Sequence, residues 1–369
     1  MGGSVFGNSF KITTWGESHG KAVGVVIDGV PAGLSLCEED IQVFLDRRKP
    51  GQSKFTTARK EGDLCEILSG VFEGKTTGTP ISVMVKNEDQ HSKDYSAIQD
   101  IYRPGHADYG FNEKFGFRDH RGGGRSSGRE TIGRVAAGAV AIKILKELGI
   151  DVITYAKAIG PVEVREDQMD LSEITENPFC LPSKSAASEA ETYVETCISE
   201  KDSAGGVVEC RVKGMPAGIG EPVFDKLDAT LARAVMSIGA VKGVEIGDGF
   251  AASKAKGSEN NDAFAMDGNR VIKKTNHAGG ILGGISDGAD ILLRAAVKPT
   301  PSIAQPQNTV TTEGTETLIE IHGRHDPIIV PRAVVVIESM VAITLCDALF
   351  SNMSARMDHI KKIYGTDAR

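Results

Sequence analysis

The spacing of apolar residues predicts alternating strands and helices over the first part of the chain. Residues 23–30 form an apolar run that ends at a Pro-Ala-Gly turn, which is typical of a buried strand. Residues 38–48 repeat apolar positions at helical spacing and predict a helix with one buried face. Two further runs, 66–72 and 81–86, flank a Gly-rich turn and predict another pair of strands.

A long apolar helix is predicted to begin near Ser127. Residues 127–130 read Ser-Gly-Arg-Glu and match a capping box, in which the Ser and Glu side chains satisfy free backbone N–H groups. Residues 135–142 are small and apolar on every side, so we expect this helix to lie buried between layers. Residues 160–205 are the most polar stretch, and we expect them to form a peripheral insertion.

The second half of the chain repeats motifs of the first half. Residues 29–33, Gly-Val-Pro-Ala-Gly, recur as Gly-Met-Pro-Ala-Gly at 214–218, and an amphipathic helix follows each copy. A Gly-rich turn before a strand at 74–86 recurs at 284–298, and a Gly-Arg pair before a long helix also recurs. This pattern predicts an internal duplication. The alternative is chance recurrence of Gly and Pro, which are common turn residues.

The elements together predict an α/β protein. Its 369 residues allow two domains or one large one. Because the repeated motifs describe two copies of a β/α unit, we expect a single fold over 1–369. Its halves would lie at about 1–150 and 205–350.

Composition and charge exclude several classes of function. The 42 Lys and Arg residues against 50 Asp and Glu give a formal charge of −8, which argues against non-specific binding of nucleic acid. No signal peptide is recognised, and no run approaches 18 apolar residues, so no membrane segment is expected. Six cysteines without a C-x-x-C pair predict reduced thiols and a cytoplasmic location.

Three short patterns are too weak to define a site. Residues 16–20 match the G-x-S-x-G pattern of serine hydrolases, with Ser18 as the nucleophile. Only 15 residues precede them, too few to build the sheet that such a nucleophile requires. Residues 70–76 fall one residue short of a P-loop, so a hairpin turn is the better interpretation. His and Cys residues lack zinc-binding spacing, so no metal site is predicted.

The segment 121–134 carries the strongest chemical signal. Four arginines fall within 14 residues, together with three consecutive glycines and with Ser126 and Ser127 at the predicted helix start. Glycines let the backbone approach a ligand, free N–H groups at a helix start favour anions, and Arg binds phosphate through two parallel bonds. The segment therefore predicts a phosphate or carboxylate site. The alternative is a solvated charged surface.

Two other features could belong to the same chemistry. A second basic cluster at 47–60 includes Arg48 and Lys54, and it could hold a second phosphate or form a charged helix end. His19 and His106 lie in Gly-flanked loops. Because imidazole titrates near pH 6.5, each could donate a proton to a leaving phosphate or hold a reduced cofactor anion. Simple solvation is the alternative.

The order of these motifs resembles the chorismate synthase family. The matching segments lie between positions 10 and 327, nearly the whole chain, and they follow the family's order. They are FKITTWGESHG (10–20), DRRKPG (46–51), RPGHAD (103–108), RGGGRSSGRET (121–131), HAGGILGG (277–284), KPTPS (298–302) and GRHDP (323–327).

The resemblance implies a lyase of the shikimate pathway. Such an enzyme converts 5-enolpyruvylshikimate 3-phosphate to chorismate and phosphate by a 1,4-anti elimination. The family requires reduced FMN although the reaction has no net redox change, and NADPH could serve as the reductant. The resemblance also implies a β-α-β sandwich fold and a homotetramer.

The resemblance further assigns roles to individual residues. His19 would protonate the departing phosphate, His106 would protonate or stabilise the reduced flavin, and Asp326 would help to remove the substrate proton. The residues implied in FMN binding are Arg125, Ser126, Ser127, Gly283, Lys298, Pro299, Thr300, Pro301, Ser302 and Arg324. Those implied in binding the phosphate of the substrate or of NADP are Arg48, Lys54 and Arg129.

Two departures from the family pattern lie near this predicted site. Gly128 stands where Ala is common, and Gly239 stands where Asn or Gln is often found, so a side-chain contact to FMN could be missing at position 239. A protein of the same fold that binds flavin or phosphate without catalysis is the second hypothesis. The presence of His19, His106 and Asp326 argues against it.

Overall fold

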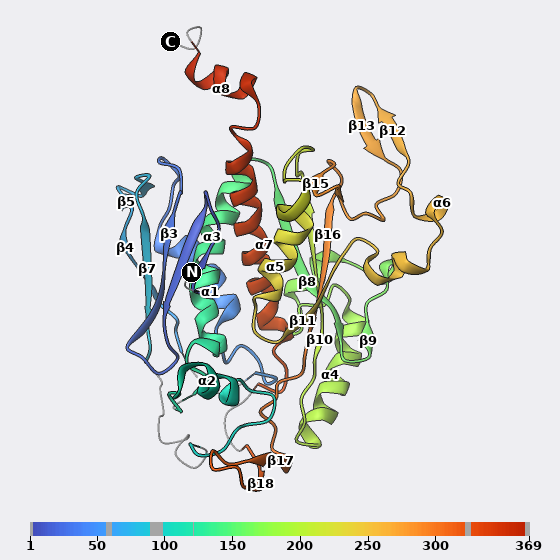
Figure 1. Cartoon of the computed structure of the whole chain (residues 1–369). Helices are drawn as coiled ribbons and strands as arrows, with labels where there is room; N and C mark the ends of the chain where they lie inside the picture. The colour runs from blue at the N-terminus through green and yellow to red at the C-terminus, as the bar shows by residue number, and fades with distance from the viewer. Residues whose placement is uncertain (1–2, 57–60, 89–98, 121, 322–325, 366–369) are drawn as a thin grey trace.

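Two antiparallel five-stranded sheets enclose a layer of helices in the computed structural model (Figure 1). The structure describes residues 3–56, 61–88, 99–120, 122–321 and 326–365. The first sheet has the strand order β1 (Val5–Phe6), β2 (Lys11–Gly16), β3 (Ala22–Asp28), β7 (Ile81–Lys86) and β4 (Cys65–Ser69). The second has the order β11 (Val241–Ile246), β16 (Ile291–Val297), β10 (Gly206–Lys213), β8 (Asp151–Ile159) and β9 (Val162–Glu163). This arrangement confirms the expected β-α-β sandwich.

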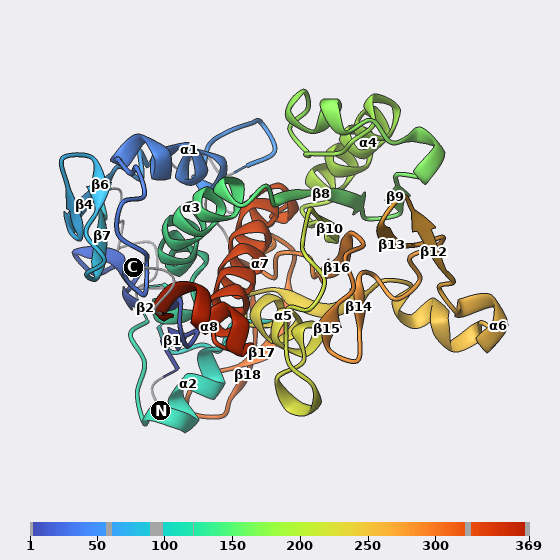
Figure 2. The same ribbon diagram turned by 90° about the horizontal axis from the view of Figure 1, so that it is seen from above.

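Four helices form the middle layer, which Figure 2 shows from above. They are α1 (Glu38–Arg48), α3 (Thr131–Glu147), α5 (Leu227–Met236) and α7 (Val330–Asn352). α3 and α7 pack against each other, α3 also covers β3, and α7 covers β8 and β10. Gly138 permits the close approach of these two helices, because a Cβ at this position would lie 2.2 Å from Ser339 Cβ.

α7 is more apolar than we expect from the sequence, in which no run approaches 18 apolar residues. Among the described residues, α7 is the one helix that is long and apolar enough to cross a membrane. However, 72% of its most apolar 18-residue stretch is buried inside the protein. Because α7 packs against helices α1, α3 and α5 and against the second sheet, burial in the core accounts for its composition.

The two halves share one strand order. β2-β3-β7-β4 in the first sheet corresponds to β8-β10-β16-β11 in the second, and β8 (Asp151–Ile159) lies ahead of the proposed second half at 205–350. The turns match as well: the Thr76 hydroxyl donates to the Pro31 carbonyl at 2.6 Å, and the Ser286 hydroxyl donates to the Pro216 carbonyl at 2.6 Å. The repeated sequence motifs therefore occupy equivalent places in the two halves, which supports an internal duplication. Its limits, 1–150 and 205–350, remain our proposal.

The long helix predicted to begin near Ser127 begins as an α-helix at Thr131, directly after a 3-10 turn that Ser127 caps. Two 3-10 turns, Gly124–Ser126 and Gly128–Glu130, precede α3. The Ser127 hydroxyl accepts a hydrogen bond from the Arg129 backbone N–H at 3.3 Å, so it caps the second 3-10 turn rather than the α-helix. The capping pattern identified a helix start, but it belongs to the shorter turn.

The remaining elements lie around this sandwich. Residues 160–205, our proposed peripheral insertion, contain the edge strand β9 and helix α4, which lies at the periphery in Figure 2. The predicted strand at 66–72 divides at Gly70, whose φ is +82°, into β4 and β5. The other elements are α2 (Asp108–Phe115), α4 (Lys184–Ser199), α6 (Gly257–Asn260), α8 (Met357–Tyr364), β5 (Val71–Phe72), β6 (Lys75–Thr76), β12 (Phe264–Asp267), β13 (Arg270–Lys273), β14 (Ile281–Leu282), β15 (Ile285–Ser286), β17 (Gln307–Val310) and β18 (Glu316–Ile319).

Candidate active site

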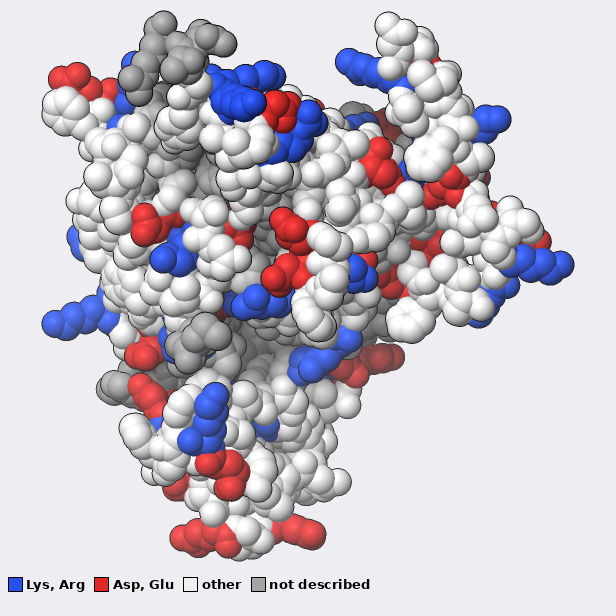
Figure 3. Space-filling model, turned by 45° about the horizontal axis from the view of Figure 1, so that its top comes forward, with Lys and Arg blue, Asp and Glu red and all other residues white. Residues whose placement is uncertain are grey.

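A large cleft of about 1830 Å³ lies between the two halves, and residues of both halves line it. Its lining includes ten Lys or Arg residues and seven Asp or Glu residues, a formal excess of three positive charges in a chain of charge −8. On the outer face shown in Figure 3, by contrast, Lys and Arg are interspersed with Asp and Glu. The charge of the cleft favours an anionic ligand.

Eleven of the sixteen residues predicted for the site line this one cleft. They are Arg48, His106, Arg125, Ser126, Ser127, Arg129, Lys298, Thr300, Pro301, Ser302 and Asp326. Because they come from widely separated parts of the chain, the fold brings the two predicted basic clusters and the 298–302 segment together.

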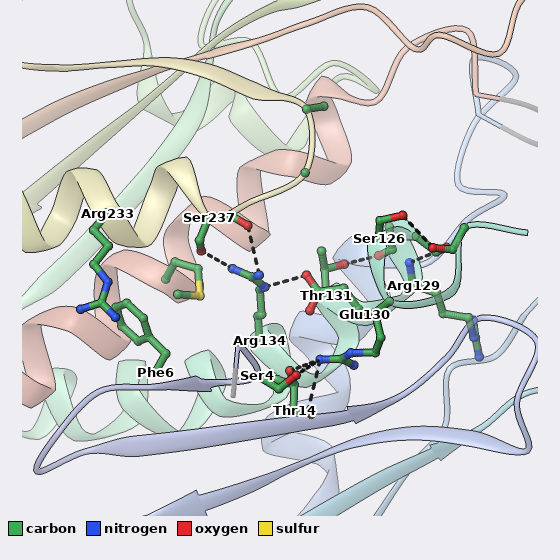
Figure 4. A pocket seen from close by; sticks show the side chains of 18 of the residues that line it. Ser4, Phe6, Thr14, Ser126, Arg129, Glu130, Thr131, Arg134, Arg233 and Ser237 are labelled. Atoms are coloured by element: carbon green, nitrogen blue, oxygen red, sulfur yellow. Dashed lines mark hydrogen bonds and ion pairs between the residues drawn. The ribbon is translucent and has the colours of Figure 1, made fainter. Parts of the chain in front are cut away.

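Arg125 fixes the segment 121–134, the predicted anion site, to the first sheet. Its guanidinium donates to Gly16 O at 2.9 Å, to Thr14 Oγ1 at 2.6 Å and to Ser4 Oγ at 3.2 Å. Figure 4 labels Thr14 and Ser4, two of these acceptors. Ser126 donates through its hydroxyl to Gly123 O at 2.7 Å. Most of the donor capacity of Arg125 is thus used within the protein, so its first role is to position the 3-10 turns.

Arg134 joins the two halves across the same cleft. From α3 its guanidinium donates to Glu130 Oε1 at 2.8 Å, and to the hydroxyl and carbonyl oxygens of Ser237 at 2.6 and 3.1 Å (Figure 4). Ser237 ends α5, whose last carbonyls lack helical partners, so the arginine caps that helix. The wall that follows, including Gly239, is thereby held against the first half.

His106 is held by hydrogen bonds at both ring nitrogens. Nδ1 donates to Pro104 O at 3.0 Å, and because a carbonyl only accepts, Nδ1 carries the proton of the neutral ring. Nε2 then accepts from the Ser302 hydroxyl at 3.1 Å. Burial, and secondarily the charge of Arg103, lower the pKa of His106 below its usual value of about 6.5. The ring is therefore neutral in the ligand-free protein at neutral pH.

The segment 298–302 closes the cleft beside His106. Lys298 Nζ donates to Gly105 O at 2.9 Å, and Ser203 donates through its hydroxyl to Thr300 O at 2.7 Å. Burial, followed by the nearby charge of Lys242, lowers the pKa of Lys298. A bound anion would relieve this repulsion between ammonium groups.

Arg48 and Arg129 form an ion-pair network with carboxylates on one wall. Asp63 accepts from Arg48 Nη2 at 2.5 Å and from Arg129 Nη1 at 2.9 Å, and Glu61 also pairs with Arg129. Arg48 is only 2% exposed. Its position so deep in the protein requires these partners, because an unpaired buried guanidinium is strongly destabilising.

Asp326 lies at the start of the segment that leads into α7. Its carboxylate forms an ion pair with Arg332, and Arg332 Nε donates to Arg48 O at 2.9 Å. Both Asp326 and Arg332 line the cleft. The proposed proton-accepting carboxylate is thus connected through one arginine to the wall that carries Arg48.

His19 lies beside the cleft rather than among the residues that line it. Ser18 Oγ and His19 Nδ1 are 3.1 Å apart, and a Cβ at Gly122 would lie 2.6 Å from the His19 ring. Glu17 and Gly123, its neighbours in sequence and in space, do line the cleft. A side chain at Gly122 would have to displace the imidazole, and its φ of +109° also favours glycine at this position.

The other predicted residues have different surroundings. Lys54 Nζ pairs with Glu191 at 2.7 Å and with Glu195 at 2.9 Å, both on α4, and does not line the cleft. Gly283 forms the turn between β14 and β15, and Pro299 lies between two residues that line the cleft. Arg324 lies outside the described residues.

The two departures from the family pattern leave open space. Gly128 and Gly239 both line the cleft, and a Cβ at either would meet no described heavy atom within 4 Å. Neither glycine is therefore required by packing, and a ligand has more room at both positions than a larger residue would allow.

Several residues of the site were not identified from the sequence. Arg103 is buried, pairs with Asp108 at 2.7 Å and lines the cleft near His106. Lys242 and Arg332 line other parts of the cleft. Arg103 lies within the RPGHAD motif, so that motif could have identified it as a site residue. Nothing in the local sequence marks Asp63 as a residue of the site.

Two polar atoms in the cleft residues lack a protein partner. Among the described residues, nothing hydrogen-bonds to Arg48 Nε or to Thr300 Oγ1, and both atoms are buried. Buried polar atoms are normally paired, so a site completed by a ligand is the natural setting for both. No group of three or more metal-ligating side chains occurs within the part of the chain that the structure describes.

The α/β fold and the excess of positive charge in the cleft are what we expect of an enzyme that acts on an anionic small molecule. The model of the family named chorismate synthase matches residues 10–350. A chorismate synthase of Lachnoclostridium phytofermentans is 64% identical over 99% of this chain and 100% of its own length. One of Methanocella arvoryzae is 56% identical over 95% of each chain.

A solved structure gives the same result at the level of the fold. The crystal structure of a chorismate synthase matches with a TM-score of 0.76 and 32% identity, and the match covers 98% of both chains. The chain belongs to the chorismate synthase family, whose members are lyases of the shikimate pathway.

Proposed function

We propose that this protein converts 5-enolpyruvylshikimate 3-phosphate to chorismate and phosphate by a 1,4-anti elimination that requires reduced FMN. The observation that carries the proposal is the single cleft, in which two arginine clusters, His106 and Asp326 meet. The substrate carries a phosphate and two carboxylates. The excess of positive charge in the cleft matches this anionic substrate.

Arg48 and Arg129 would hold the phosphate that leaves. Guanidinium groups form charge-assisted hydrogen bonds with phosphate oxygens, and these bonds strengthen as the oxygen gains charge. As the C–O bond breaks, its electron pair leaves with the phosphate, and His19 at the edge of the cleft would donate a proton to it. The Gly122–Gly124 loop beside the imidazole would keep it directed at this wall.

The described residues fit a flavin mononucleotide. The cleft offers the partly buried Ile329 to an apolar ring, and Ser126, Ser127 and Lys298 to polar and anionic groups. The unpaired Thr300 Oγ1 supplies a further polar atom in the same wall. Arg125, with Pro299, Pro301 and Ser302, would shape this side, as would Gly283 and Arg324. When bound, the reduced flavin supplies electron density to the substrate as phosphate leaves and recovers it as the proton is lost.

His106 would protonate or stabilise the reduced cofactor. The neutral ring, with its lowered pKa, stands beside Lys298 and Arg103, whose charges oppose a further positive charge. An anion bound here would offset those charges and raise the proton affinity of Nε2. His106 would thus gain its proton only in the loaded site.

Asp326 would help to remove the proton from the substrate carbon. Its ion pair with Arg332 fixes the direction of the carboxylate, and a carboxylate held in place is a more effective base than a mobile one. Abstraction of this proton as phosphate departs leaves the electron pair of the C–H bond in the new diene.

We also propose the broader properties that accompany this function. NADPH could reduce the flavin, with Lys54 at its phosphate, in which case Lys54 would exchange Glu191 and Glu195 for that ligand. The six cysteines carry free thiols in the structure, which supports a cytoplasmic location. The assembly would be a homotetramer, and the small-molecule substrate would be the principal partner, without nucleic acid or membrane.

The test is conversion of 5-enolpyruvylshikimate 3-phosphate by purified protein with reduced FMN under anaerobic conditions. A product with the absorbance of a conjugated diene is expected, and His106→Ala should lose most of that turnover while it remains folded. Tight binding of FMN without any diene would instead support the non-catalytic flavin-binding protein.

A further inference from the structure

One buried carboxylate joins the two arginines of the phosphate wall. Asp63 Oδ2 accepts from Arg48 Nη2 at 2.5 Å, and Oδ1 accepts from Arg129 Nη1 at 2.9 Å. The Asp63 side chain is 0% exposed, and those of Arg48 and Arg129 are 2% and 9% exposed. Each carboxylate oxygen is thus assigned to one guanidinium, and of the residues that the structure describes Asp63 is the one that bonds to both. Arg129 is also held by Asn87 Oδ1, which accepts from Nε, and by Lys86 O, which accepts from Nη2 at 3.2 Å.

Asp63 stands behind the arginines rather than in the cleft. Arg48 and Arg129 line the cleft, as does Glu61, but Asp63 is not among the residues that line it. A ligand in the cleft can therefore replace Glu61 at Arg129 while Asp63 keeps its bonds. Arg48 Nη1 also donates to Gly128 O at 3.3 Å, but Arg48 Nε has no partner among the described residues and is left for another acceptor.

The backbone at Asp63 is a second, independent sign that its side chain is needed. Its φ is +47°, in the left-handed region, which Asp and Asn occupy more readily than other residues with a side chain but less readily than glycine. Glycine would adopt this conformation without strain, and one precedes it at position 62. A strained backbone that is retained at a cleft wall points to a function of the side chain.

We propose that Asp63 is a positioning residue for the leaving phosphate. It holds Arg48 and Arg129 side by side, so that both present N–H groups to the same phosphate. This inference rests on the proposed function, because it assigns that phosphate to the two arginines. Asp63 itself does not touch the substrate.

Asp63→Asn tests the inference with little change in volume, and Asn also tolerates the left-handed backbone. One amide oxygen can still accept from one arginine, but the NH2 group faces the other. The KM for the substrate should rise about 10- to 100-fold, because a charged hydrogen bond at a buried site is lost. The kcat should fall less, and the Kd for FMN, measured by quenching of flavin fluorescence, should stay unchanged.

Asp262→Asn is the matched control. Asp262 is also a buried carboxylate, 2% exposed and paired with Lys273 at 3.1 Å, but it does not line the cleft. This variant should lose stability without a change in the KM for substrate. An Asp63→Asn protein that stays folded with an unchanged KM would overturn the inference, as would an equal rise in the KM of the control.

Calorimetric titration with inorganic phosphate separates this inference from the proposed reaction, since it needs no turnover. Wild type should bind phosphate more tightly than Asp63→Asn. In the background of Arg129→Lys, the same substitution should change phosphate affinity several-fold less, because its effect passes through that guanidinium. Equal effects in the two backgrounds would contradict the coupling, whether or not the protein turns over substrate.

Discussion

Ser302 Oγ and His106 Nε2 lie 3.1 Å apart, although 196 positions separate the two residues in the chain. His106 belongs to the first half and Ser302 to the second, so the contact closes the cleft between them. The Pro104 carbonyl fixes which nitrogen of His106 is protonated, because a carbonyl only accepts, and Ser302 therefore donates to Nε2. The fold thus selects the tautomer of a proposed catalytic residue.

The lowered pKa of His106 predicts a pH dependence of stability. Burial and the charge of Arg103 disfavour protonation in the folded protein, so the unfolded chain takes up this proton first as the pH falls below about 6.5. Wild type should therefore lose stability from pH 7.5 to 5.5, and His106→Asn should lose less. Urea unfolding of both proteins at the two pH values measures the difference. Identical losses would contradict the lowered pKa.

Arg125 and Ser126 are neighbours with unequal structural roles. Arg125 makes hydrogen bonds to Gly16, Thr14 and Ser4, so Arg125→Ala should lower the free energy of unfolding by about 2–4 kcal/mol. Ser126 is exposed and bonds only within its own turn, so Ser126→Ala should cost less than about 1 kcal/mol. Chemical denaturation compares them, and equal losses would refute the anchoring role of Arg125.

Two glycines should respond in opposite ways to replacement by alanine. A Cβ at Gly138 would lie 2.2 Å from Ser339 Cβ, so Gly138→Ala should destabilise the protein by about 1–3 kcal/mol or more as α3 and α7 separate. Gly128 has open space and a negative φ, so Gly128→Ala should be neutral or stabilise by up to about 1 kcal/mol. Thermal unfolding of both variants provides the measurement, and a destabilised Gly128→Ala would contradict the open space at this position.

The six free cysteines should fall into two kinetic classes. Cys37 is exposed, whereas burial raises the pKa of Cys65 and Cys180 to about 11 and that of Cys210 to about 12. Because the thiolate is the reactive form, a disulfide reagent should label Cys37 quickly, whereas the partly exposed Cys180 and the four buried thiols should react slowly or only on unfolding. Cys37→Ser should abolish the fast phase, and a fast phase that persists would place another thiol at the surface.

Local patterns predicted much of the fold but not the geometry of the site. The helix at 38–48 and the strand at 81–86 match α1 and β7, since both are decided by the spacing of apolar residues. α3 begins four residues after Ser127 because Ser127 caps a 3-10 turn. Patterns of capping residues do not distinguish these two kinds of helix.

The basic clusters were recognisable as anion sites, but their carboxylate partners were not. Asp63 joins arginines that are 15 and 66 positions away, and only the packing of α1 against α3 brings them together. Lys54 shows the converse case, since its local sequence resembles that of a phosphate ligand while its contacts in the structure are with α4. Long-range partners of this kind require the three-dimensional fold.

The most direct measurement follows phosphate and diene together in one anaerobic reaction of wild-type protein with 5-enolpyruvylshikimate 3-phosphate. With dithionite-reduced FMN, we expect equal molar amounts of phosphate and diene at every time. With oxidised FMN, we expect neither product. Folded protein that binds FMN but releases no phosphate, or that releases phosphate without the diene, would contradict the assignment of the cleft as the site of this elimination.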